Sequence, residues 1–151
     1  MSEPQPRESF YGSPLPLAEG ERVVHHIRPD ARVYLRAALV LAVVFGTLAG
    51  GALLALGNPT PWVGPVAALA AIAVRAIWLR SEALAAEWRL TDRRLLGPGG
   101  QSIALSAIAA VRPVFGDLVV ITRAGDKHLL KYLADGPATR AAIEKAAGVA
   151  R

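Results

Sequence analysis

The sequence predicts an α+β membrane protein, built as a two-helix transmembrane hairpin followed by a small β-sandwich or partly open barrel that a C-terminal α-helix caps. Three observations predict this class: two long apolar segments, a series of short apolar runs between turn residues, and an alanine-rich tail. The composition agrees, because 53% of the 151 residues are hydrophobic and only 19% are charged. Such a balance is too apolar for a soluble domain of this length.

The first apolar segment, residues 37–56, contains twenty consecutive residues without a charge. A helix rises about 1.5 Å per residue, so a segment of this length covers the hydrocarbon core of about 30 Å. Its leucine, valine and phenylalanine side chains favour insertion by about 3 to 6 kcal/mol in total. We therefore expect this segment to cross the bilayer unaided.

The second apolar segment, residues 62–79, is less apolar and contains Arg75. A charge at the centre of a membrane helix costs about 2.5 to 3.5 kcal/mol, but Arg75 lies one turn from the predicted end of the segment. Its long side chain can extend to the headgroups, which removes most of that cost. Trp62 and Trp78 would lie about 24 Å apart on a straight helix, a spacing that suits the two interfacial belts of aromatic residues.

A short turn rich in glycine and proline, residues 57–61, joins the two segments and predicts an antiparallel hairpin. Gly46 and Gly50 form a G-x-x-x-G pair on the first segment, and Gly64 and Ala68 are small residues on the second. Small residues let helix backbones approach closely in a membrane. These residues therefore predict either the packing face of the hairpin itself or a face for self-association.

The charges that flank the two segments predict the orientation. Arginines precede the first segment and follow the second, whereas the linking turn has none. Because the cytoplasmic loops of membrane proteins carry the excess of Lys and Arg, we expect both termini to face the cytoplasm. The residues expected to anchor this topology are Arg36, Trp62, Arg75, Trp78 and Arg80.

The remaining sequence divides into a lead-in and a β domain. Residues 1–32 are polar and contain several spaced prolines, which is typical of a partly disordered lead-in rather than a cleavable signal. The hairpin with its flanks then covers residues 33–80. The β domain, expected in the cytoplasm, covers residues 84–148.

Short apolar runs in the β domain predict about six strands, because each run is bounded by turn residues. The continuous run at residues 118–121 has the length of a strand buried on both faces, so we expect it at the centre of the core. Asp135 and Gly148 are the expected caps of a C-terminal helix. The predicted strands are residues 87–91, 94–97, 102–105, 110–114, 118–123 and 127–133.

Several short motifs follow one another in residues 20–147. They are Gly20-Glu21-Arg22-Val23-Val24 with Arg28-Pro29, the WRLTDRRLL sequence of residues 88–96, Leu105-Ser106-Ala107-Ile108, Ala110-Val111-Arg112 and Gly116-Asp117-Leu118. With the apolar hairpin, these motifs resemble a family of bacterial membrane proteins in which a pleckstrin-homology-like (PH-like) domain is attached to two transmembrane helices.

The resemblance implies a multi-pass protein of the bacterial plasma (inner) membrane, with a PH-like fold held against its cytoplasmic face. It does not imply an enzyme. In eukaryotic PH domains a basic loop between the first two strands binds phosphoinositides. Only Arg93 and Arg94 represent that loop here, so recognition of lipid headgroups is not carried over.

The candidate surface residues are basic side chains at two predicted hairpins. Near an anionic surface each Lys or Arg contributes about 1 kcal/mol of attraction. The same charges are also ordinary on solvated turns, and on sheet edges they discourage aggregation. The residues expected to face a membrane or a partner are Arg93, Arg94, Arg123, Lys127 and Lys131.

Other classes of site have no candidate residues. The chain lacks cysteine, and the neighbouring His25 and His26 would point to opposite faces of a strand, so no metal site is expected. No serine or threonine has a defensible base, and the glycine-rich residues 97–100 lack the Lys of a phosphate loop, so we expect no catalytic residue, cofactor or small-molecule substrate. The scattered basic residues also do not predict a nucleic-acid partner.

Two functions remain for the expected fold. The first is a non-enzymatic, membrane-anchored interaction module whose PH-like domain docks a protein partner or the anionic membrane surface. Besides the lipid bilayer, its expected partner is another protein or a second copy of the chain. The alternative is a small hairpin subunit of a transporter or channel assembly, in which Arg75 is a polar contact inside the membrane.

Overall fold

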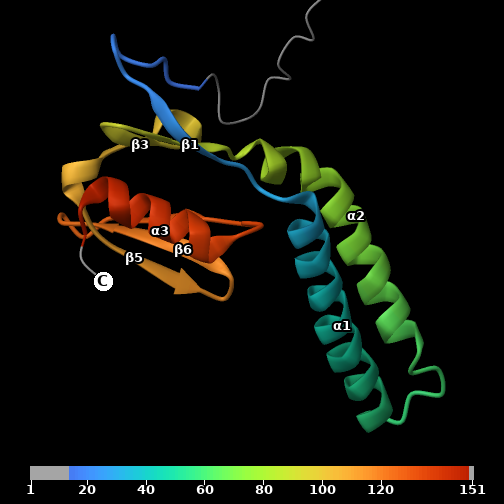
Figure 1. Ribbon diagram of the computed structural model, residues 1–151. Helices are drawn as coiled ribbons and strands as arrows, with labels where there is room; N and C mark the ends of the chain where they lie inside the picture. The colour runs from blue at the N-terminus through green and yellow to red at the C-terminus, as the bar shows by residue number, and fades with distance from the viewer. Residues whose placement is uncertain (1–13, 150–151) are drawn as a thin grey trace, which may run out of the picture. The chain divides into compact units, whose positions relative to one another are not determined.

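The computed structural model describes residues 14–149, which form two compact units. One unit, the apolar hairpin, spans residues 31–83, and the other, the β unit, combines residues 14–30 with residues 84–149. Figure 1 shows the long helices of the first unit, and the sheets and the C-terminal α-helix of the second. The predicted α+β class is confirmed, whereas the disorder expected in the lead-in falls largely on residues 1–13, outside the described residues.

The apolar hairpin consists of α1 (Ala31–Ala55) and α2 (Val63–Ala85), both long and apolar enough to cross a membrane. The helices exceed the predicted segments, since α1 begins six residues before residue 37 and α2 continues six residues past residue 79. A search for uncharged apolar residues finds only the part of a helix that is apolar enough to lie in lipid. Arginine, serine and glutamate are compatible with helix, so the backbone hydrogen bonding continues past the apolar stretch.

Small residues form the contact between α1 and α2. Gly46, Gly50 and Gly64 are all buried, and Ala68 is half-buried. A Cβ atom added to Gly64 would lie 2.8 Å from the carbonyl carbon of Ala49, and one added to Gly50 would lie 3.1 Å from a proline side chain of α2. Only glycine allows the backbones to approach this closely. The small residues therefore lie at the contact between two helices of one chain.

Within residues 14–149, the β unit contains seven strands in two antiparallel sheets. The strand order is β1-β2-β3-β4 in the first sheet and β5-β6-β7 in the second. The six strands predicted after the second apolar segment are confirmed, and β1 is an additional one. The strands are β1 (Val23–Ile27), β2 (Trp88–Thr91), β3 (Arg94–Leu96), β4 (Ser102–Ala104), β5 (Ile108–Val114), β6 (Asp117–Thr122) and β7 (Lys127–Leu130).

Strand β1 lies in the segment that the sequence analysis placed outside the β domain. It pairs antiparallel with β2, and Ile27 at its end is the register partner of Trp88. Both apolar helices are therefore an insertion between two paired strands. The domain boundary differs from the predicted one because β1 is identified by a partner strand on the far side of the hairpin, which local sequence patterns do not reveal.

The core of the β unit is formed by apolar side chains from both sheets and from the C-terminal helix. Trp88 of β2 is buried and its ring meets the ring of His128 of β7 edge-on, with centroids 6.3 Å apart. A Cβ on Gly97 would lie 2.6 Å from the Trp88 ring, so glycine is required there. The fully buried side chains include Leu90, Leu95, Leu96, Ile108, Leu118, Val120, Leu130 and Ile143.

The central strand β6 differs from the prediction for residues 118–121. Leu118 and Val120 are buried, but Val119 and Ile121 are only half-buried. One face of β6 thus packs on the core and the other is partly open to solvent. Continuous apolarity misled the prediction because the outward positions of this strand are also apolar.

Helix α3 (Gly136–Ala147) follows the second sheet and packs on β5 and β6. The predicted caps are confirmed: the side chain of Asp135 accepts a hydrogen bond from the backbone N–H of Ala138 at 2.9 Å, and Gly148 adopts φ +65° just past the last turn. The second sheet and α3 form two layers in Figure 1. This packing places Ile143 in the core, where it is fully buried.

We predict that Gly64→Ala destabilises the helix contact by about 1–3 kcal/mol, because the added methyl group would overlap the α1 backbone. The measurement is the thermal unfolding midpoint of the full chain in detergent micelles. Gly51→Ala is the matched control, since a Cβ at position 51 meets no atom within 4 Å. If the two variants unfold at the same temperature, the close approach of α1 and α2 at Gly64 is wrong.

Candidate functional site

The five basic residues selected from the sequence lie at two hairpins of different sheets. Arg93 and Arg94 belong to the β2–β3 hairpin, whereas Arg123, Lys127 and Lys131 lie on or beside the β6–β7 hairpin. Four of them are exposed, and Arg94 is only partly so. The contacts of each hairpin therefore decide which cations are available to a partner.

Arg94 makes an internal ion pair rather than facing solvent freely. Its Nε lies 2.9 Å from Oε1 of Glu21, and its Nη2 lies 3.0 Å from Oε2 of the same carboxylate. The guanidinium also donates to the carbonyl oxygen of Pro16 at 3.2 Å. This bidentate arrangement uses the fork of the guanidinium, so Arg94 mainly fixes the segment before β1 to β3.

Glu21 is the buried partner in this ion pair, and its side chain has no exposed surface. Hydrogen bonds from Arg94, from the backbone N–H of Ala18 and from the hydroxyl of Thr91 lower the pKa of Glu21 from 4.5 to about 2. The Thr91 hydroxyl lies 2.7 Å from Oε1 of Glu21 and accepts the backbone N–H of Arg94 at 3.0 Å. Local sequence reveals neither the burial of Glu21 nor its partner, so Glu21 was predicted only as part of a motif.

Arg93 is the exposed cation of the same hairpin. Its Nη1 lies 3.4 Å from the carbonyl oxygen of Glu19, which is a long contact at the surface. In the structure the loop between the first two strands is the apolar hairpin, so the Arg93–Arg94 turn joins the second and third strands. The position assigned to this turn in the sequence analysis is therefore corrected.

A second charged cluster, the neck cluster, lies where the chain leaves β1 and returns to β2. Oε1 of Glu87 lies 3.0 Å from Nδ1 of His26 and 3.1 Å from Nε of Arg28. Burial raises the pKa of Glu87, but the hydrogen bonds from His26 and Arg28 outweigh it, so the net pKa is lowered. These side chains are partly or largely exposed, so each pair contributes only about 0–1 kcal/mol. The cluster joins the two strand ends that flank the helical insertion.

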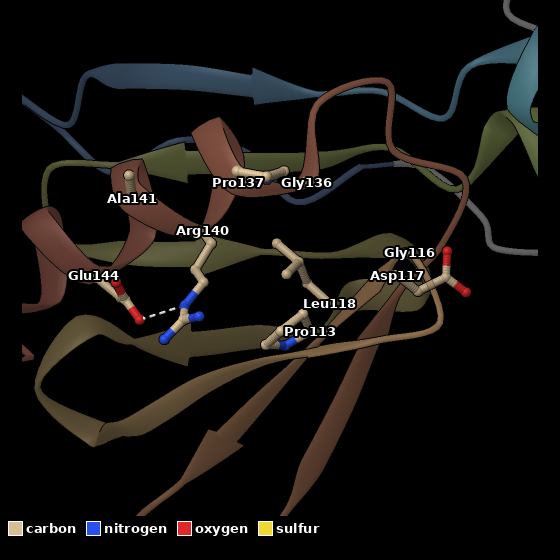
Figure 2. A pocket seen from close by; sticks show the side chains of 9 residues that line it. All are labelled: Pro113, Gly116, Asp117, Leu118, Gly136, Pro137, Arg140, Ala141 and Glu144. Atoms are coloured by element: carbon tan, nitrogen blue, oxygen red, sulfur yellow. Dashed lines mark hydrogen bonds and ion pairs between the residues drawn. The ribbon is translucent and has the colours of Figure 1, made fainter. Parts of the chain in front are cut away.

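A groove of about 480 Å³ lies between α3 and the β5–β6 hairpin, and we call it the α3 groove. Figure 2 shows Pro113 and Leu118 along its strand side, with Arg140 and Glu144 at one end and the Gly116 turn at the other. Nε of Arg140 lies 2.7 Å from Oε1 of Glu144. The groove thus combines an apolar wall with a paired cation and carboxylate.

The membrane-anchor residues predicted from the sequence lie in or next to the apolar hairpin. Trp62 and Trp78 are exposed, as are Arg36, Arg75 and Arg80. Arg75 projects from α2 ten residues before the end of that helix, because α2 extends to Ala85. Among residues 14–149, no group of three or more His, Cys, Asp or Glu side chains is arranged to hold a metal ion.

Comparisons of the chain with protein-family models, curated proteins and solved structures give no match.

We predict that the ion pair of Glu21 makes the β unit sensitive to acid. The folded pKa of about 2 lies below the ordinary value of 4.5, so this stabilisation is complete above pH 4.5 and is lost as the pH falls towards 2. Glu87 contributes in the same direction, since its pKa is also lowered. Glu21→Gln should lower the unfolding midpoint at neutral pH and flatten its dependence on pH across this window.

Near-ultraviolet circular dichroism of the full chain in detergent, followed on heating at several pH values, measures this effect. Glu19→Gln is the control, because Glu19 is exposed and lies two positions away. Equal behaviour of the two variants would show that the Glu21–Arg94 pair does not stabilise the fold.

Proposed function

We propose that this chain is a membrane-anchored interaction module without catalytic activity. In this proposal α1 and α2 cross a bacterial plasma membrane and hold a PH-like β unit at its cytoplasmic surface. The β unit docks a partner there.

The observation that carries the membrane anchor is the exposure of large apolar side chains on α1 and α2. Leu39, Phe45 and Leu48 of α1 are 52–64% exposed, and Ile77 and Trp78 of α2 are 77% and 81% exposed. A soluble protein rarely leaves a contiguous apolar surface of this extent in water. Lipid removes this cost, and each helix has the length that the hydrocarbon core requires.

The short connections to the helices support a role at the membrane surface. Three residues join β1 to α1, and two join α2 to β2. An extended chain covers at most about 3.6 Å per residue, so these short connections keep the ends of β1 and β2 within roughly 10 Å of the helix ends. A domain restricted in this way meets ligands at or near the bilayer rather than deep in the cytosol.

The PH-like assignment is supported by the order of the elements. Four antiparallel strands, then three antiparallel strands, then one C-terminal helix match the small sheet sandwich with a capping helix that the sequence motifs imply. In this arrangement the apolar hairpin occupies the connection between the first two strands. A phosphoinositide loop has no place there, so the proposal assigns docking to another surface.

The α3 groove is the docking surface that we propose for a protein partner. Pro113 is exposed on its apolar wall and can contact an apolar side chain, and the nearby Arg140–Glu144 pair supplies both signs of charge for orientation. Pro137 and Ala141 of α3 also line the groove, and both are exposed.

The membrane anchor predicts that two identical substitutions at exposed leucines of α1 differ in effect. Leu48→Arg places a charge near the centre of the apolar stretch, where it costs about 2.5–3.5 kcal/mol of insertion. Leu35→Arg lies near the helix end, where the side chain reaches the headgroups and most of that cost disappears. We expect alkaline carbonate to release the Leu48→Arg chain from membranes but not the Leu35→Arg chain.

Leu48 is 64% exposed and Leu35 is 67% exposed. If water surrounded the hairpin, the two substitutions would therefore have the same effect. Release of the unmodified chain by carbonate would contradict the anchor.

The docking surface predicts a position-dependent crosslink. A photoreactive phenylalanine in place of Ala141 should form an adduct of discrete mass with another protein in native membranes. The same group in place of Ala138, which is exposed on α3 outside the groove, is the matched control and should give little adduct. Equal labelling at both positions, or none at either, would contradict a docking role for the α3 groove.

A further inference from the structure

The tip of the β5–β6 hairpin presents an aromatic side chain in an unfavourable backbone conformation. Val114 pairs with Asp117, so Phe115 and Gly116 alone form the turn, with φ angles of +50° and +93°. Such two-residue turns favour Asn, Asp or Gly, because other L residues are strained at positive φ. The Phe115 side chain is fully exposed, so no packing within the described residues compensates for this strain.

Hydrogen bonds place this tip at the end of the β unit where the chain leaves for α1. The carboxylate of Asp117 accepts the backbone N–H of Tyr132 at 2.9 Å. The carbonyl oxygen of Tyr132 accepts the backbone N–H of Asp30 at 2.7 Å, and α1 begins at the next residue. Tyr132 also has a positive φ, +58°. Tyr132 thus links Asp117, two residues past Phe115, to the last residue before α1.

Apart from Asp117, whose carboxylate accepts the backbone N–H of Tyr132, the residues around the tip are apolar and basic. Val114, next to Phe115, is 40% exposed, and Leu129 on the same outward face of the sheet is 43% exposed. Arg112 is also exposed on this face, where it pairs with Val119. Apolar side chains with neighbouring cations suit the boundary between lipid headgroups and acyl chains, because the cation meets anionic headgroups while the apolar groups enter the interface.

We propose that Phe115 and Val114 insert into the interfacial layer of an anionic bilayer and form a third attachment of the chain, beside α1 and α2. This inference rests on the proposed membrane anchor and adds a specific lipid contact to it. The occupant is the bilayer rather than a protein, because the tip is fixed at the point where the chain passes into its membrane helix. Withdrawal of a Phe side chain from water shifts the equilibrium about tenfold to hundredfold towards the inserted state.

The absence of cysteine allows a direct test on the full chain. Val114→Cys carries an environment-sensitive fluorophore next to an intact Phe115, and the chain is reconstituted in liposomes of phosphatidylcholine and phosphatidylglycerol. Lipids with a quencher near the headgroup should quench this label. Adding Phe115→Asn should abolish the quenching while the fold is retained, because Asn is favoured at positive φ.

Two further labelled positions make the result interpretable. Ala124→Cys lies in the turn at the opposite end of β6, about 20 Å from the tip at the usual strand rise, and should not be quenched. Leu48→Cys, on α1, reports the membrane anchor itself and should be quenched by lipids that carry the quencher deep in the acyl chains. Near-ultraviolet circular dichroism checks that each variant is folded.

The outcomes separate the inference from the function on which it rests. Quenching at positions 48 and 114, lost with Phe115→Asn, supports the insertion. Quenching at position 48 without quenching at position 114 overturns the insertion and leaves the membrane anchor intact. No quenching at position 48 overturns both. A label at position 114 that is shielded from water but not quenched by lipid indicates contact with a second copy of the chain and also overturns the insertion.

Discussion

The pairing of β1 with β2 is the constraint on which the rest of the structure depends. It closes a long loop that contains both apolar helices, and the register pair of Ile27 and Trp88 lies at the base of that loop. The entropic cost of loop closure grows slowly with length, by about 0.6 kcal/mol for each doubling. The fold therefore tolerates an insertion of this length. The antiparallel hairpin lowers this cost further, because α1 and α2 return the chain towards its starting point.

The charged residues divide between structural and accessible roles, and sequence patterns alone do not separate them. Arg93 and Arg94 are adjacent arginines, yet Arg93 is exposed whereas Arg94 forms an ion pair with the buried carboxylate of Glu21. The distinction depends on Glu21. This residue lies in a polar segment that precedes the apolar hairpin in the sequence, whereas both arginines follow that hairpin. The same long-range pairing that forms the first sheet therefore determines which arginine is available at the surface.

Local sequence patterns were sufficient for elements with local signals. Two uncharged stretches indicated the helices, turn residues delimited six strands, and Asp135 and Gly148 marked the ends of α3. Strand β1 and the α3 groove were missed, because both depend on partners that are distant in the sequence. Phe115 was also missed. Two-residue turns usually have the sequence Asn-Gly, and only the glycine is present in the Phe115–Gly116 turn. An aromatic residue in that position is a signal that could have identified the tip.

The placement of β1 ahead of the helices has a consequence for biosynthesis. If α1 and α2 cross a bilayer, β1 is made before either crossing and β2 only after the second one. A chain whose second helix failed to return would leave these two strands on opposite faces of the membrane. Trp88 would then lack its strand partner, and the first sheet would stay open with its core exposed. Completion of the β unit would therefore require the chain to return to the side of the membrane on which β1 was made.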